Sequence, residues 1–224
     1  ERTLVRPAKF GAVTWAGGSS SLHMPALHHG AGRVFLHLLD HGQLQQLPQT
    51  PEIMLRNQVT ALAQLPSSTV VCGCGGGSSV AALLPKVLEH SARLLLDAAA
   101  LNAIAADAML RQRLKNRGAA GLPTVLTPHP LEAARLLNSS VPAVQADRLA
   151  AAHTLANTLD CTVLLKGSGS IIASPGEVPH INPTGNALLA TGGTGDVLAG
   201  MVAAHWASMQ NNVNSNAHHA ACPG

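Results

Sequence analysis

The chain alternates short apolar runs with longer segments in which alanine and leucine are mixed with polar residues. The apolar runs predict β-strands at 11–16, 34–39, 69–72, 93–97, 124–127, 161–165 and 171–174. The mixed segments predict helices at 22–29, 57–65, 80–90, 98–114, 131–137, 147–158 and 197–204. Most of these strands lack an alternating polar face, which is typical of parallel sheets that helices cover on both sides. The pattern therefore predicts an α/β protein with a mostly parallel central sheet.

One domain accounts for the pattern. The 224 residues are enough for one sizeable core, and no internal repeat or interdomain linker interrupts the alternation. We expect a single, shortened domain over 1–207 and a polar, asparagine-rich tail over 208–224. The connection between the first two predicted strands is short for a crossover helix, which takes about ten to twelve residues.

Composition excludes several classes of function. Apolar residues make up 46% of the chain and charged residues 11%, and the formal charge of +3 is not concentrated in a basic run. We therefore expect no nucleic-acid partner. No window reaches the roughly 18 apolar residues of a membrane span, and no signal peptide opens the chain, so we expect no membrane partner.

The four cysteines follow no zinc-site or CxxC spacing. We interpret Cys72 and Cys74, which lie in an apolar strand-to-loop context, as reduced core thiols, which fits a cytoplasmic protein. His218, His219 and Cys222 offer metal-ligand side chains, but a frayed end of the chain explains them more simply, and we expect no protein-held metal there.

The strongest candidate for chemistry is a glycine-rich loop that runs into the last predicted helix. The stretch 190–200 reads Ala-Thr-Gly-Gly-Thr-Gly-Asp-Val-Leu-Ala-Gly. A loop of this kind presents unpaired backbone N–H groups and the positive end of the helix dipole, which together bind anions. Asp196, at the start of the helix, is either an N-terminal cap or a general base beside a bound phosphate.

Four other stretches follow predicted strands. The glycine cluster 73–77 allows a close backbone approach to a ligand, or is simply a flexible turn. Asp97 ends a strand, where α/β proteins place ligand contacts. His129 lies between two prolines that restrict its backbone, and Glu132 follows in the first helical turn, where the helix dipole alone would explain it. The turn 166–170, Lys-Gly-Ser-Gly-Ser, places a cation between two apolar strands but lacks the order of a P-loop.

Taken in order, these stretches resemble the ADP- or ATP-dependent NAD(P)H-hydrate dehydratases of the ribokinase-like superfamily. The resemblance is carried by Val125-Leu-Thr-Pro-His-Pro-Leu-Glu132, Leu164-Leu-Lys-Gly-Ser-Gly-Ser170, Asn182-Pro-Thr-Gly-Asn186 and Gly192-Gly-Thr-Gly-Asp-Val-Leu-Ala-Gly200. It covers most of residues 8–204, and it implies the three-layer α/β/α ribokinase-like fold.

The resemblance also implies an activity, the repair of damaged nicotinamide nucleotides. The nucleotide phosphorylates the hydroxyl of (6S)-NADH or (6S)-NADPH hydrate, and phosphate then leaves to restore the double bond. Bacterial members favour ADP as the donor, with Mg²⁺ on the phosphates. The family commonly forms homo-oligomers and can work beside an epimerase of the same hydrates.

Residue roles follow from the same resemblance. Asp196 would take the hydroxyl proton and touch the substrate. The substrate-binding residues would be Gly73, Gly75 and His129, and the nucleotide-binding residues would be Lys166, Gly167, Ser168, Gly169, Ser170, Gly193 and Gly195. The N–H groups of 193–195 would also stabilise charge on the transferred phosphoryl group.

The chain departs from the family pattern at several positions. Cys74 replaces a proline, Leu131 a glycine and Ala99 an acidic residue, and both ends of the domain are trimmed. Two alternative functions therefore stay open. One is a ribokinase-like kinase of a small alcohol or vitamin precursor, and the other is a degenerate nucleotide-binding module without turnover.

Overall fold

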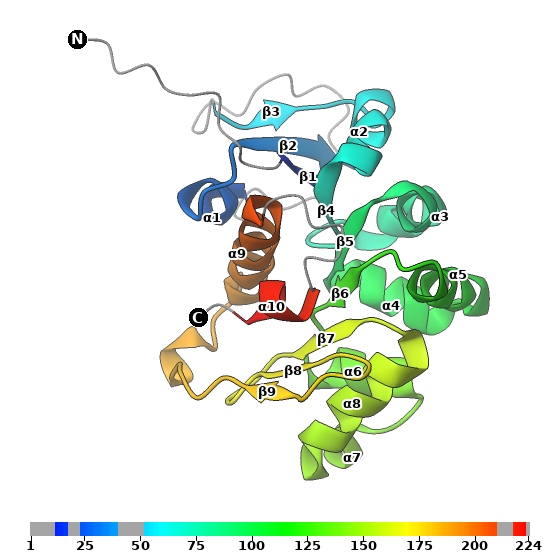
Figure 1. Ribbon diagram of the computed structural model, residues 1–224, viewed down its shortest axis with the longest axis vertical. Helices are drawn as coiled ribbons and strands as arrows, with labels where there is room; N and C mark the ends of the chain where they lie inside the picture. Colours follow the sequence, from blue (N-terminus) through cyan, green and yellow to red (C-terminus); the bar gives the residue numbers. More distant parts are fainter. Residues whose placement is uncertain (1–11, 18–22, 40–51, 210–216, 223–224) are drawn as a thin grey trace.

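The computed structural model describes residues 12–17, 23–39, 52–209 and 217–222. Its centre is one sheet in the order β3-β2-β1-β4-β5-β6-β7-β8-β9 (Figure 1). The first seven strands in this order, from β3 through β2 and β1 to β7, run parallel. Strands β8 and β9 are added antiparallel at one edge. The strand bounds are β1 Ala12–Gly17, β2 Arg33–Leu38, β3 Met54–Leu55, β4 Ser68–Cys72, β5 Arg93–Leu96, β6 Thr124–Leu126, β7 Thr162–Leu165, β8 Ile171–Ala173 and β9 His180–Ile181.

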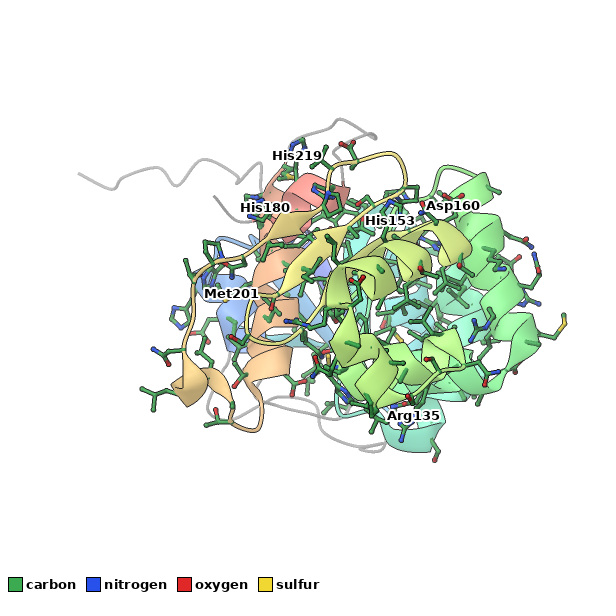
Figure 2. All side chains as sticks on the ribbon, turned by 90° about the horizontal axis from the view of Figure 1, so that it is seen from below. Arg135, His153, Asp160, His180, Met201 and His219 are labelled. Carbon is green, nitrogen blue, oxygen red and sulfur yellow. The ribbon has the colours of Figure 1, made fainter. Side chains whose placement is uncertain are left out.

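Helices cover both faces of the sheet, so the predicted three-layer α/β/α arrangement is confirmed. One face carries α1 His23–His28, α9 Thr194–Ser208 and α10 Ala217–Ala221. The other face carries α2 Gln58–Gln64, α3 Val80–His90, α4 Ala98–Ala106, α5 Ala108–Ala119, α6 Pro130–Leu137, α7 Val141–Ala146 and α8 Arg148–Leu159. A view turned by 90° shows α9 and α10 on one side of the sheet and α8 on the other (Figure 2).

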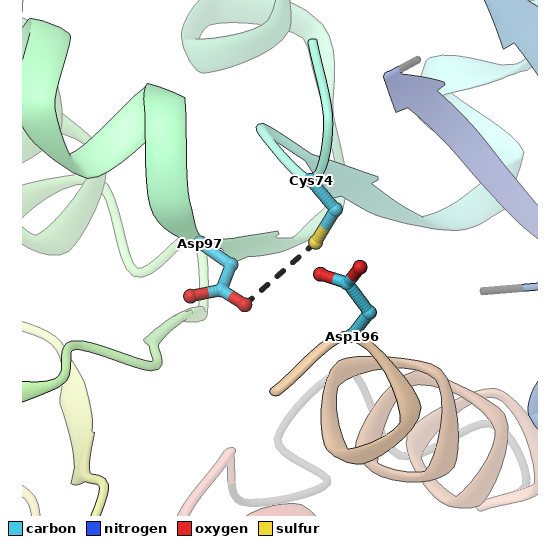
Figure 3. A group of neighbouring side chains, drawn as sticks. All are labelled: Cys74, Asp97 and Asp196. Carbon is cyan, nitrogen blue, oxygen red and sulfur yellow. Dashed lines mark hydrogen bonds between the residues drawn. The ribbon is translucent and has the colours of Figure 1, made fainter. Parts of the chain in front are cut away.

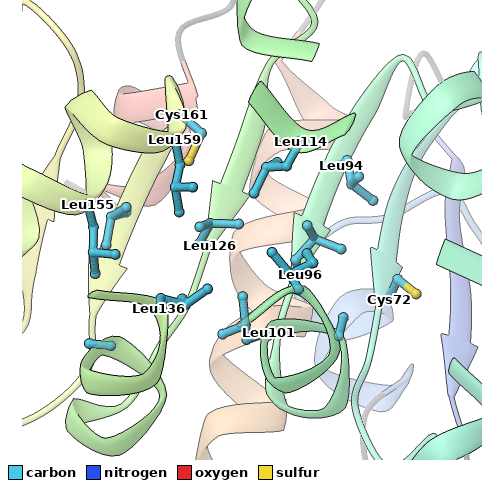
Figure 4. Packing of buried hydrophobic residues seen from close by; sticks show 14 of the residues in the cluster. Cys72, Leu94, Leu96, Leu101, Leu114, Leu126, Leu136, Leu155, Leu159 and Cys161 are labelled. Atoms are coloured by element: carbon cyan, nitrogen blue, oxygen red, sulfur yellow. The ribbon is translucent and has the colours of Figure 1, made fainter. Parts of the chain in front are cut away.

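Strands β4 to β7 are largely buried because each face of the sheet has its own core. In β5, Leu94 and Leu96 pack with the helices of the larger layer, whereas Leu95 packs with α9. The larger core is built mainly from leucine, with Cys72 and Cys161 among its buried members (Figure 4). This two-sided burial is what the uninterrupted apolar runs predicted.

The structure corrects the predicted elements in three places. The expected helix over 98–114 is two helices, because Asp107 ends α4 in an extended conformation and then caps α5 through the Met109 and Leu110 N–H groups. Helix α7, capped by Ser140, was not predicted. The two-residue strands β3 and β9 were not predicted either. Each is an edge strand whose existence depends on hydrogen bonds to one neighbouring strand, and so short a run carries no local pattern.

The chain end is not frayed where the structure describes it. Helix α10 packs against α9, β6, β7 and β8, and Ala217, Ala220 and Ala221 are buried there. His218 joins them through a buried hydrogen bond between its Nδ1 and Ser174 Oγ, at 2.9 Å. The polar stretch 210–216 of the predicted tail lies outside the described residues.

Candidate functional site

The candidate residues gather at the carboxyl edge of the parallel strands. The loops that follow β4, β5, β6 and β7 carry Gly73, Asp97, His129 and Lys166, in the order in which these strands lie side by side. The N-terminus of α9 reaches the same edge. A methyl group added at Gly195 would lie 3.3 Å from Lys166 Nζ and 3.9 Å from Asp97 Oδ2. Segments that lie between about 24 and 122 positions apart in sequence therefore meet at one place.

Helix α9 begins with its backbone N–H groups turned to this site. Gly193 is its N-terminal boundary residue, with φ +88°, a conformation that glycine adopts without strain. Among the described residues, no side chain caps the first turn of α9. Gly193, Gly195 and Asp196 thus surround a helix start that can accept an anion.

Lys166 and Asp97 form the ion pair at the floor of the site. Lys166 Nζ lies 2.7 Å from Asp97 Oδ1, and the exposed fractions of the two side chains are 17% and 2%. Asp97 also accepts a hydrogen bond from the Ala98 N–H at 2.9 Å. The carboxylate is consequently held in one orientation, with its Oδ2 directed toward Cys74.

His129 and Glu132 form a capping box at the start of α6. His129 Nδ1 accepts from the backbone N–H groups of Leu131 and Glu132, and Glu132 Oε2 accepts from the His129 N–H at 2.8 Å. An accepting Nδ1 places the ring proton on Nε2, which lies 3.3 Å from Glu132 Oε1. The imidazole is 45% exposed and remains accessible to a ligand.

Glu132 does more than interact with the helix dipole. Its side chain is 3% exposed, and its Oε2 lies 3.9 Å from Lys166 Nζ. Burial raises the pKa of this carboxyl, against the lowering effect of the His129 N–H and of Lys166. Glu132 therefore links His129 to the Lys166–Asp97 pair.

Asp196 and Cys74 complete the polar cluster. Cys74 Sγ lies 3.7 Å from Asp97 Oδ2, and Asp196 projects toward both from the first turn of α9 (Figure 3). Burial, followed by the charge of Asp97, raises the pKa of Asp196, which makes its carboxylate a better proton acceptor. Burial and the two nearby carboxylates likewise raise the pKa of the Cys74 thiol.

The turn after β4 requires glycine. Gly73 has φ +118°, and a Cβ there would lie 2.0 Å from the Asp97 carbonyl oxygen. Gly75 has φ +63° and is exposed. The cluster is thus a tight turn that packs on the loop after β5, and its exposed part remains open to a ligand.

The loop 166–170 is fixed by a residue that the sequence did not reveal. Arg148, at the start of α8, donates to the carbonyl oxygens of Leu165, Lys166 and Ser168. Gly167 and Gly169 take φ values of +145° and +64°, and Ser170 Oγ donates to the Gly167 carbonyl at 3.0 Å. This loop meets the polar cluster through Lys166, which contacts Asp97 and Glu132.

Sequence reasoning noted Asp97 and Glu132 without committing them to the site, and it missed Arg148. The signal for Asp97 was its position at the carboxyl end of a strand. Nothing local marked Arg148, because its three partners follow it by 17 to 20 positions.

A surface pocket of about 280 Å³ lies elsewhere, at the amino ends of β5 and β6. Its lining includes Arg117, whose guanidinium donates to the carbonyls of Leu88 and Ser91 and to Thr124 Oγ1. Burial lowers the pKa of Arg117 to about 10. These contacts join α3 to β6, which is a structural role, so the pocket is separate from the polar cluster.

Comparison with known proteins gives consistent relatives. The family model described as NAD(P)H-hydrate dehydratase matches residues 11–224. An ADP-dependent (S)-NAD(P)H-hydrate dehydratase of Neisseria meningitidis is 37% identical over 86% of this chain and 68% of its own length. A bifunctional NAD(P)H-hydrate repair enzyme of Gloeobacter violaceus is 35% identical over 90% of this chain, which spans 40% of that longer protein.

Solved structures agree on the fold. A ribokinase-like superfamily protein of Enterococcus faecalis superposes with a TM-score of 0.74 and 25% identity, over 99% of this chain and 79% of that one. An ADP/ATP-dependent NAD(P)H-hydrate dehydratase of Bacillus subtilis, co-crystallized with ATP and Mg²⁺ and soaked with CoA, has a TM-score of 0.68 and 23% identity. That superposition covers 98% of this chain and 80% of the other.

Proposed function

Because the chain belongs to the NAD(P)H-hydrate dehydratase family, we propose that it converts the (6S) hydrate of NADH or NADPH back to the intact nucleotide with consumption of ADP. The observation that carries the proposal is the uncapped start of α9, which presents Asp196 to the Lys166–Asp97 pair. Such a site can hold a phosphoryl group and a hydroxyl together. Hydroxide is a poor leaving group and phosphate a good one, so phosphorylation makes the elimination feasible.

Asp196 is the proposed general base. Its carboxylate takes the proton of the hydrate hydroxyl as that oxygen attacks the terminal phosphorus of the nucleotide, and the bond to the leaving nucleotide breaks. The N–H groups at 193–195 stabilise charge on the transferred phosphoryl group. Phosphate then departs from the nicotinamide ring, a ring proton is lost, and the double bond is restored.

The substrates are proposed to bind on either side of this start of α9. His129, Gly73 and Gly75 contact the hydrated dinucleotide, supported by the exposed imidazole and the open turn after β4. Lys166, Gly167, Ser168, Gly169, Ser170 and Gly195 hold the nucleotide that leaves as AMP. Lys166 supplies the cation, and the exposed loop behind it supplies polar backbone groups.

Mg²⁺ is the proposed metal. The nucleotide phosphates and water would supply most of its oxygen ligands, and the Asp97 carboxylate is an oxygen donor of the kind that this ion takes, so the residues fit. When bound, Mg²⁺ neutralises charge on the phosphates.

We also propose that the protein works beside an epimerase of the same hydrates and that it is cytoplasmic. The cytoplasmic location is supported by the free thiols of all four cysteines. None of the helices described is both long and apolar enough to cross a membrane.

Replacing Asp196 by Asn tests the proposal. The measurement is recovery of NADH absorbance from purified NADH hydrate with Mg²⁺ and either ADP or ATP. We expect recovery by the natural chain to require nucleotide and to fall about 10²- to 10⁴-fold in Asp196→Asn, because the amide cannot accept the proton.

Nucleotide binding is the control for this experiment. ADP at about one hundred times its Kd adds about 2.7 kcal/mol to the free energy of unfolding, and we expect this in both proteins. Absence of recovery from a folded chain that still binds ADP would instead favour the degenerate nucleotide-binding module. Phosphorylation of a small alcohol without NADH recovery would favour the ribokinase-like kinase.

A further inference from the structure

Cys74 brings a thiol into an otherwise oxygen-rich site. Cys74, Asp97 and Asp196 each offer one ligand atom, and these atoms all lie within 4.8 Å of one another (Figure 3). They come from three elements: the turn after β4, the end of β5 and the first turn of α9. Within the described part of the chain, no other trio of histidine, cysteine, aspartate or glutamate meets in this way.

We propose that Cys74, Asp97 and Asp196 form a binding site for a thiophilic divalent cation of the Zn²⁺ or Cd²⁺ type. Such an ion would block the site, because it engages the carboxylate that the reaction needs. The inhibition rests on the proposed function, whereas the binding does not.

The donor set selects the ion. One thiolate with two carboxylates suits Zn²⁺ and Cd²⁺, whereas Mg²⁺ takes oxygen ligands alone. A tetrahedral ion with Zn–S of about 2.3 Å and Zn–O of about 2.0 Å separates a sulfur and an oxygen ligand by about 3.5 Å. The distance of 3.7 Å between Cys74 Sγ and Asp97 Oδ2 is close to this value.

Asp97 is already oriented for the ion. Its Oδ1 is held by Lys166 Nζ at 2.7 Å and by the Ala98 N–H at 2.9 Å, which leaves Oδ2 directed at the thiol. Partners of this kind orient the ligands of natural metal sites. Asp97 and Cys74 are buried, and Asp196 is half-buried, so the ion would enter from the α9 side.

The charges of the site balance when the ion binds. A thiolate and two carboxylates carry three negative charges, which the divalent ion and the Lys166 ammonium together neutralise. Binding breaks the S–H bond of Cys74 and forms a sulfur–metal bond, and the released proton passes to solvent. No oxidant or reductant takes part.

Titration of the purified chain with Cd²⁺, without nucleotide or substrate, tests the site. The readouts are the thiolate-to-cadmium charge-transfer absorption and the stoichiometry from equilibrium dialysis. We expect one Cd²⁺ per chain, a band that Zn²⁺ displaces, and loss of the band in Cys74→Ser.

Cys222→Ser is the matched control, since Cys222 follows His218 and His219 of α10 and is the one partly exposed cysteine, the other three being buried. We expect its band to persist. Asp196→Asn keeps the thiol and changes a half-buried residue, and we expect at least about tenfold weaker Cd²⁺ binding. This variant keeps the test decisive if Cys74→Ser does not fold.

Three results would overturn the proposal: no band in the folded natural chain, a band that persists in Cys74→Ser, or unchanged affinity in Asp196→Asn. The test is separable from the proposed function. Cd²⁺ binding by a chain that never restores NADH would leave the cation site and remove the dehydratase, and NADH recovery without a cadmium band would do the reverse.

Discussion

Lys166 links side chains from the loop after β5 and from the start of α6. Its ammonium lies 2.7 Å from Asp97 Oδ1 and 3.9 Å from Glu132 Oε2, and Glu132 in turn orients His129. Asp97 and Glu132 are both almost completely buried. A buried carboxylate that loses its cation keeps the cost of desolvation without compensation.

Removing the cation should therefore destabilise the fold. We expect Lys166→Met to lower the free energy of unfolding by about 1–3 kcal/mol, because the Asp97 carboxylate is left unpaired. Denaturant unfolding measures this change. The pair Lys166→Met with Asp97→Asn should recover part of the loss, and strictly additive effects would contradict a direct coupling between the two side chains.

The turn after β4 is the element that positions Cys74 and the open face of the site. Gly73 and Gly77 both have positive φ, at +118° and +52°. They differ in the room available for a side chain. A Cβ on Gly73 would lie 2.0 Å from the Asp97 carbonyl oxygen, whereas a Cβ on Gly77 would have none of the described atoms within 4 Å.

Alanine at the two positions should separate steric from conformational cost. We expect Gly73→Ala to lower the free energy of unfolding by about 3 kcal/mol or more, because the backbone beneath it cannot move aside cheaply. Gly77→Ala, the matched control, should cost about 1–2 kcal/mol for its φ alone. Thermal and denaturant unfolding measure both, and equal costs would argue against the close packing.

Helix α10 is docked by a buried polar chain. The hydrogen-bonded series runs from Thr162 Oγ1 to Ser174 Oγ at 2.8 Å and on to His218 Nδ1 at 2.9 Å. Burial lowers the pKa of His218. The charge of Glu177 opposes this shift, and the neighbouring side chains of His219 and His180 add to it. His180 and His219 lie on the same side of the molecule (Figure 2).

The docking of α10 should weaken in acid. The pKa of His218 in the folded chain lies below its ordinary value, so the unfolded chain binds the proton more readily. This contribution to stability is complete above the ordinary pKa of histidine, near 6.5, and is lost as the pH falls through and below that value. We expect the free energy of unfolding to fall less on acidification in His218→Gln than in the natural chain.

The control for this pH series is His90→Gln, whose side chain is exposed at the end of α3 and does not belong to the groups that shift the pKa of His218. It should keep the acid sensitivity of the natural chain. Identical pH profiles for all three proteins would show that His218 does not link α10 to pH.

At the scale of the whole molecule, the β9 edge exposes apolar side chains. Val178, Ile181, Leu188 and Leu189 are 86%, 52%, 82% and 57% exposed, and they follow one another along one stretch of chain. Strand β9 pairs with β8 on one side only. Exposed apolar residues beside an edge strand are a common interface between subunits.

We therefore expect a homo-oligomer that uses this edge. Light scattering after size exclusion should give a multiple of the single-chain mass, and Ile181→Lys should shift it toward the single chain because a cation replaces an apolar contact. Val59→Lys is the control, since Val59 is 77% exposed on α2, away from β9. A single-chain mass for the natural protein would refute the expectation.

Much of the fold was predictable because its signals are local. The strand core is encoded by apolar runs such as 93–96. The boundary at Asp107 is also a local signal, because its side chain competes for nearby backbone N–H groups, but the continuous helical pattern over 98–114 hides it. The short strands β3 and β9 carry no such local signal. They exist because a neighbouring strand supplies their hydrogen-bond partners.

For the site, local patterns in the sequence indicate the glycine-rich turns at 73–77 and 166–170 and the position of Asp196 at the start of a helix, since each depends on neighbours within about four positions. The capping box at His129 is also local, but Glu132 was expected to act through the helix dipole alone. No local pattern indicates that Lys166 pairs with Asp97, 69 positions away, that Cys74 faces both carboxylates, or that Arg148 holds the loop after β7; these contacts come from the folded chain. Separation along the chain does not set distance in space. The parallel sheet does, because it brings the carboxyl ends of its strands to one edge.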